Sequence, residues 1–350
     1  MRLLRYLIRL KRRKKQPRNR TEGCQRISEL KGSVFVSEKK KEWNQLHTAA
    51  REGDISKMES LLSDGICIDS QESTHKTPLM IAAFNGKLRA VRYLIENGAD
   101  MSIVDNSGWN SLHFASQGGD PDMIDLIASH VADIDSLASE AFTPLMVASD
   151  NGRLQAVKYL LKSGADLSLK DGNGWKPVHH AARGGNPAVI ELFLCEVEEI
   201  DLRANRGETP LMIAGYYGNL QAVKYFLEKG ADPSLKDKKG WNSLHHASRG
   251  VNPDVIELFL RCMADDAIDS KTNQWYTPLM IAAGNGRLQI VEFLARKNAC
   301  PYARDNNGYF PYDWALHSQE PRTLDCLLKQ TALAFEIQIF KERMIEYCDP

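Results

Sequence analysis

Residues 77–95 read Thr-Pro-Leu-Met-Ile-Ala-Ala-Phe-Asn-Gly-Lys-Leu-Arg-Ala-Val-Arg-Tyr-Leu-Ile and predict two short helices with a turn between them. Threonine caps a helix well, and the proline that follows suits the first helical position. Gly86 interrupts the first helix, and apolar residues then recur at helical spacing as far as Ile95. Gly98 is a natural end for the second helix. We therefore expect a helix-turn-helix unit here.

The same pattern returns along the whole chain. Thr-Pro-Leu-Met occurs at 77–80, 143–146, 209–212 and 277–280, and related segments ending in Leu-His or Val-His lie halfway between these. The period is 33 residues, with one two-residue insertion around 261–267, so that nine units begin at 44, 77, 110, 143, 176, 209, 242, 277 and 310. A unit of this size cannot bury its apolar face alone, and stacked units are expected to build one continuous core.

These units resemble the ankyrin repeat, whose pattern is a turn, T-P-L-H-x-A, a glycine, a second helix and G-A-D. Residues 154–161 followed by Gly164-Ala165-Asp166 match the second half, with close copies at 88–95 and 220–227. The resemblance covers roughly residues 40–329. It implies an all-α ankyrin-repeat solenoid of stacked helix-turn-helix units with hairpin-like turns. It also implies a non-enzymatic scaffold or adaptor that binds a protein or peptide partner in a concave groove.

The sequence divides into three segments. Residues 1–38 form a basic N-terminal arm, predicted to be disordered or partly helical. Residues 39–329 form the array, and residues 330–350 are predicted to be an amphipathic helix that caps its C-terminal end. The first 20 residues hold ten Lys or Arg and no acid, whereas the other 330 hold 35 basic and 45 acidic residues. The formal net charge of zero therefore conceals a basic arm on an acidic body.

The arm has two functional interpretations. Leu4, Leu7 and other apolar residues can share one helical face, with Arg2, Arg5 and Arg9 opposite, which favours an anionic membrane surface as partner. The unbroken basic run Lys11, Arg12, Arg13, Lys14, Lys15 instead favours an import receptor or nucleic acid. A solubilising tail is the third alternative. We therefore expect a cytoplasmic protein, with the nucleus or a peripheral membrane position as the alternatives.

Several classes of chemistry are excluded by the motifs. The seven cysteines are scattered without a C-x-x-C pair, which argues against a disulfide framework or a zinc module and favours a reducing compartment. The sequence contains no P-loop, no G-x-S-x-G and no H-E-x-x-H. We expect no catalysis, no cofactor and no small-molecule substrate. His47, His113, His179 and His245 occupy one repeat position, and we expect them to hydrogen-bond neighbouring units.

The candidate binding residues follow from the resemblance. In ankyrin arrays the residue before the Thr position lies along the concave side, and here it is aromatic in seven of nine units: Trp43, Trp109, Phe142, Trp175, Trp241, Tyr276 and Tyr309. We call this set the aromatic row. A second concave set, seven residues after each unit start, includes Arg51, Phe84, Arg183, Tyr216, Arg249 and His317. Aromatic and arginine side chains are enriched at binding hot spots. The alternative is that each Trp only shields its own turn.

Overall fold

A computed structural model describes residues 45–131, 133–196, 199–318 and 320–332. Contacts divide the chain into two units, Met1–Lys40 and Lys41–Pro350, and every described residue belongs to the second. In this described part all regular elements are helical and no strand occurs, which confirms the all-α prediction. None of the described helices is long and apolar enough to cross a bilayer. The basic arm, Trp43 and residues 333–350 lie outside the described residues.

The helices come in pairs, one pair for each repeat unit. The pairs are α2 (Gln45–Glu52) and α3 (Ile55–Ser63), α4 (Pro78–Phe84) and α5 (Leu88–Glu96), α6 (Ser111–Gly118) and α7 (Pro121–Ala128), α8 (Pro144–Asp150) and α9 (Leu154–Lys162), α10 (Pro177–Gly184) and α11 (Pro187–Leu194), α12 (Pro210–Tyr217) and α13 (Leu220–Glu228), α14 (Ser243–Arg249) and α15 (Pro253–Cys262), and α16 (Pro278–Gly284) and α17 (Leu288–Arg296). The last pair is α18 (Pro311–Ala315) with the helical residues 321–332. Each first helix begins one residue after the start that the repeat pattern gives for its unit.

Capping explains where these short helices begin. At the start of α4 the Thr77 hydroxyl accepts a hydrogen bond from the Met80 N–H at 3.3 Å, and Pro78 occupies the first turn. In α6 the Asn110 side chain takes the same role and accepts from the His113 N–H at 3.2 Å. Several second helices start in the same way, as α11 does behind Asn186. Helices of seven to ten residues are marginal alone, so their stability comes from stacking.

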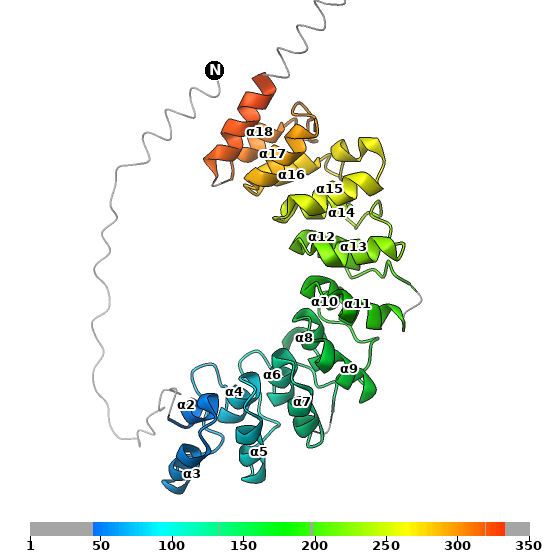
Figure 1. Cartoon of the computed structure of the whole chain (residues 1–350). Coiled ribbons are helices and arrows are strands. Elements are labelled where there is room, and N and C mark those ends of the chain that lie inside the picture. The colour runs from blue at the N-terminus through cyan, green and yellow to red at the C-terminus, as the bar shows by residue number, and fades with distance from the viewer. Residues whose placement is uncertain (1–44, 132, 197–198, 319, 333–350) are drawn as a thin grey trace, which may run out of the picture. The chain divides into compact units, whose positions relative to one another are not determined.

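Small residues bring the first helices of neighbouring units together. Ala82 and Ala83 in α4, Ala115 in α6 and Ala148 in α8 are all fully buried. First helices of successive units therefore contact one another more extensively than second helices do. Within this unit the stack bends toward the first helices, which form its inner side (Figure 1). One apolar cluster runs through it from Leu46 to Leu327, as the repeat pattern predicts.

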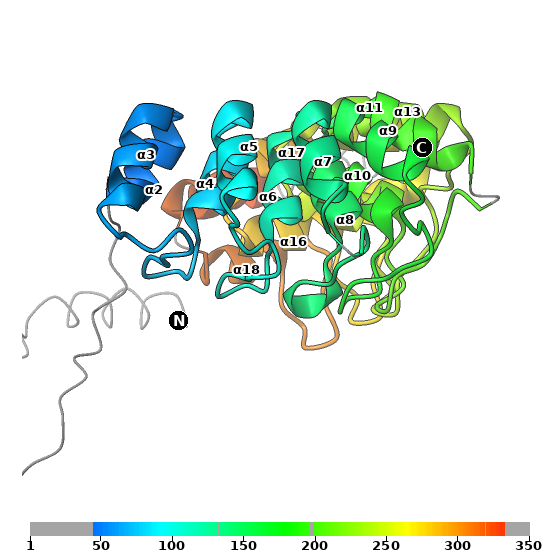
Figure 2. The ribbon, with the colours of Figure 1, turned by 90° about the horizontal axis from the view of Figure 1, so that it is seen from below.

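Hairpin-like loops connect the pairs and are joined to one another by main-chain hydrogen bonds. Within one hairpin the Asp105 N–H donates to the Trp109 carbonyl at 2.9 Å. Between hairpins the Ser139 N–H donates to the Ser107 carbonyl at 3.0 Å, and the Gly172 N–H to the Glu140 carbonyl at 2.7 Å. The hairpins lie together at one side of the stack, and the second helices at the other (Figure 2). The predicted hairpin-like turns are thus present and mutually braced.

Candidate partner-binding groove

The tryptophans of the aromatic row lie where a hairpin meets the first helix of its own unit. The main-chain N–H of Trp109 donates to the Asp105 carboxylate at 3.0 Å. The Trp109 indole packs on His113 with ring centroids 5.8 Å apart. Trp175 and Trp241 repeat both contacts, on Asp171 and Asp237 and on their own histidines. All three side chains are half-buried. Each therefore braces its own turn and still offers a surface to solvent.

Four depressions along the inner side contain most of the predicted residues. The first, of about 400 Å³, brings together Trp109, Phe142 and Arg183 from three successive units. The second, of about 220 Å³, contains Trp241 and Arg249. The third, of about 310 Å³, contains Tyr276, Tyr309 and His317. A fourth, of about 440 Å³, joins Arg51 and Phe84 from the second predicted set.

Two arginines of the second set pack against a pair of tyrosines on the inner side. Arg249 lies over the Tyr216 ring at 5.5 Å, and Arg183 lies over the Tyr217 ring at 5.6 Å. The two tyrosine rings meet edge to face with centroids 4.9 Å apart. Tyr217 is 42% exposed and was not among the predicted residues. A cation–π contact at an exposed site is worth about 0.5–1 kcal/mol, so these contacts favour the orientation of the two arginines.

A charged cluster lies beneath the aromatic row in the middle of the array. His180 is buried with Asp171 at 3.4 Å and Asp150 at 3.7 Å, and Asp150 pairs with Arg183 at 2.7 Å. Burial lowers the pKa of His180, but the two carboxylates more than offset this, and the pKa is raised above its ordinary value. The rings of Phe142 and Trp175 pack against the imidazole. The cluster thus fixes two members of the aromatic row.

The four histidines at the shared repeat position are structural, as the sequence predicts. Their Nε2 atoms lie against main-chain carbonyls: His47 with Lys76 at 3.2 Å, His113 with Phe142 at 3.1 Å, His179 with Leu202 at 3.2 Å, and His245 with Tyr276 at 3.2 Å. Burial lowers the pKa of the last three to about 4. Each of these three imidazoles is therefore neutral at pH 7 and donates Nε2–H to the loop that leads into the next unit.

Sequence reasoning missed several groove residues. Trp314 packs against Tyr276 with ring centroids 4.5 Å apart and lines the third depression. Arg206, Lys238 and Lys239 line the second. The sequence signal that could have identified these three residues is the presence of Lys or Arg in two consecutive hairpins. The prediction considered only the position before each helix start and the position seven residues after each unit start, and so missed it. The predicted arm residues, from Lys11 to Lys15, lie outside the described residues.

Comparisons with known proteins agree with this architecture. A family model described as ankyrin repeats matches residues 18–105, 94–171, 145–237, 178–272 and 244–338. The crystal structure of the human ASB11 ankyrin repeat domain superposes with a TM-score of 0.53 at 18% sequence identity, covering 63% of this chain and 99% of that chain. A search of curated protein sequences gives no match. Ankyrin repeats generally serve as modules of protein–protein interaction. The family model matches well over half of the chain, which therefore belongs to the ankyrin-repeat family.

Proposed function

We propose that this array is a non-enzymatic scaffold or adaptor that binds a protein or peptide partner along its inner side. The observation that supports this most strongly is the depression shared by Trp109, Phe142 and Arg183. Aromatic and arginine side chains from successive units form one wall there, and these are the residue types that dominate binding hot spots. Because the depressions recur from unit to unit, an extended peptide can contact several of them at once.

The test removes the indoles of three units together. Trp109→Ala, Trp175→Ala and Trp241→Ala should abolish capture of the partner in an affinity pull-down read by mass spectrometry, since hot-spot truncations cost roughly 2 kcal/mol or more each. The matched control is Tyr93→Ala, Tyr159→Ala and Tyr225→Ala, three half-buried aromatics at one repeat position on the second helices. The control should retain capture.

Circular dichroism at 222 nm separates lost binding from lost folding, since both variants must keep helical signal equal to that of the parent. A tryptophan variant that stays folded and still captures the same proteins would assign these indoles to bracing alone. Trp109→Phe, Trp175→Phe and Trp241→Phe should restore part of the capture, because a phenyl ring keeps much of the apolar surface but cannot fill the whole indole site.

A further inference from the structure

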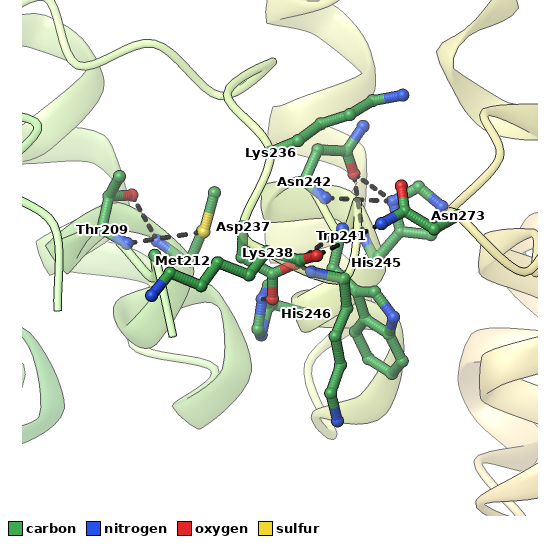
Figure 3. Close-up of polar contacts among 12 residues, drawn as sticks. Thr209, Met212, Lys236, Asp237, Lys238, Trp241, Asn242, His245, His246 and Asn273 are labelled. Carbon is green, nitrogen blue, oxygen red and sulfur yellow. Dashed lines mark hydrogen bonds and ion pairs between the residues drawn. The ribbon is translucent and has the colours of Figure 1, made fainter. Parts of the chain in front are cut away.

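The second depression holds more cationic side chains than any of the other three depressions. It lies between the hairpins of two consecutive units, residues 205–208 and 237–241, with Arg249 at the end of α14. Four cationic side chains line it: Arg206, Lys238, Lys239 and Arg249. All four are exposed, and among residues that the structure describes none of them forms an ion pair. Figure 3 shows Lys238 beside Asp237, Trp241 and His246 at this hairpin.

Asp237, one of two acidic side chains in the lining, is already engaged. Asp237 accepts hydrogen bonds from the Lys239 N–H at 2.8 Å and the Trp241 N–H at 2.9 Å, and its other oxygen lies 3.1 Å from His246 Nε2. Its side chain is only 5% exposed. It therefore fixes the hairpin and cannot swing out to neutralise the lysines. With four cationic and two acidic side chains, the lining keeps a formal net charge of +2, which attracts an anionic ligand.

Glu208 is the other acidic residue of the lining. Its Oε2 atom is buried, so a ligand in the depression cannot reach that atom. The half-buried Trp241 indole beside the cations offers an apolar contact. A peptide that carries a carboxylate next to an apolar side chain matches both the cations and the indole.

Three hairpins closer to the N-terminus lack this character. Residues 105–108, 139–141 and 171–174 contain Asp105, Glu140 and Asp171 and no lysine or arginine. An acidic segment is thus attracted at one part of the inner side and repelled at another. Charge complementarity of this kind fixes the position and direction of a bound chain more than it sets the total affinity.

We propose that the depression between residues 205–208 and 237–241 binds an acidic segment of a partner protein. A glutamate or aspartate carboxylate of the segment lies among the four cations, and an apolar side chain packs on Trp241. This deepens the proposed function and rests on it, because it names the chemistry of the partner at one site of the same groove.

The experiment measures fluorescence anisotropy of a fluorescein-labelled, glutamate-rich peptide with one central leucine, titrated with the full chain. Lys238→Glu with Lys239→Glu should weaken binding by about tenfold or more, since two attractions become repulsions. The control, Lys158→Glu with Lys162→Glu, makes the same charge change at two exposed positions of α9 and should stay within about twofold of the parent. A peptide with glutamine in place of glutamate should lose binding to the parent.

Three outcomes overturn the proposal: no binding of the glutamate-rich peptide to the parent, equal weakening by both lysine pairs, or tighter binding of a single-stranded oligonucleotide of the same charge. The last would assign the site to nucleic acid. The same experiments distinguish failure of this proposal from failure of the proposed function. If the tryptophan variant loses the captured protein while Lys238→Glu with Lys239→Glu keeps it, and the peptide does not bind, the groove function stands and the acidic-segment proposal falls.

Discussion

At the scale of single residues, methionine and histidine alternate at one repeat position and share one task. The Met80 sulfur accepts the Thr77 N–H at 3.4 Å, and His179 Nδ1 accepts the Lys176 N–H at 3.1 Å. Histidine does more, because its Nε2–H also reaches a carbonyl beyond its own helix pair. The sequence alternates between two unit types, a trace of duplication. In every second unit, therefore, a histidine side chain hydrogen-bonds main chain beyond its own helix pair.

These buried histidines predict acid destabilisation. The pKa of His113, His179 and His245 falls from an ordinary 6.5 to about 4 on folding, because burial disfavours the imidazolium. Between these pH values the unfolded chain binds more protons than the folded one. The free energy of unfolding should therefore decrease as pH falls from 6.5 to 4, by on the order of 3 kcal/mol for each histidine. Urea midpoints across this range measure it.

A matched pair of variants assigns the effect. His113→Gln should lower the urea midpoint at pH 7, because it loses the hydrogen bond to the Phe142 carbonyl, and should flatten the decline toward pH 4. His130→Gln, at an exposed position in the loop after α7, should reproduce the parent curve. His180 acts in the opposite direction: its raised pKa contributes stability below pH 6.5 that is lost as pH rises through its folded value. A His113→Gln curve parallel to the parent would contradict this account.

At the scale of helices and turns, two glycines at one repeat position allow a controlled comparison. A Cβ on Gly184, at the end of α10, would lie 2.3 Å from the Ser149 carbonyl oxygen, whereas on Gly118, at the end of α6, it would lie 3.4 Å from the Phe84 carbonyl oxygen. Gly184→Ala should therefore destabilise the array by about 1–3 kcal/mol through overpacking against main chain. Gly118→Ala should be neutral or stabilise by up to about 1 kcal/mol through helix propensity. Thermal unfolding followed at 222 nm compares them, and equal midpoints for the two variants would contradict the argument.

Most helix boundaries follow from the sequence, since Thr-Pro, Asn-Pro and the mid-unit glycines are local signals. One turn does not. Val251 stands where other units have glycine, and a β-branched residue does not adopt the left-handed conformation that Gly119 and Gly185 take at this point. The structure ends α14 at Arg249 and places Gly250 in an extended conformation instead. With valine at 251, the backbone change that ends the first helix occurs at Gly250, one residue earlier than in the units with glycine. The repeat register alone does not predict this shift.

The position of the aromatic row, like the helix boundaries, follows from local sequence signals. The repeat register locates the aromatic row, because each member precedes a helix start. It does not show which members meet, since Trp109 and Phe142 share a depression with Arg183, whereas Trp175 packs on His180. Nor does it show the role of Asp150, whose ion pair with Arg183 crosses between units. Such contacts depend on how far the stack bends, a property of the assembled array rather than of one unit.

At the scale of the whole molecule, the charge of the chain is divided. The first 20 residues carry ten basic side chains and no acid, and the rest of the chain has an excess of acids. We propose that this arm localises the array. Membrane attachment needs both the apolar face and the charge, since each supplies part of the affinity. Nuclear import needs mainly the basic run.

A fluorescent fusion of residues 1–20 distinguishes these two modes. Leu4→Asp with Leu7→Asp should abolish membrane attachment, because charged groups on the apolar face cannot enter the lipid boundary, and should leave nuclear import nearly unchanged. Glutamine at Lys11, Arg12, Arg13, Lys14 and Lys15 should impair both modes. Imaging of the parent fusion gives the reference, and a diffuse parent would exclude both and leave a solubilising tail.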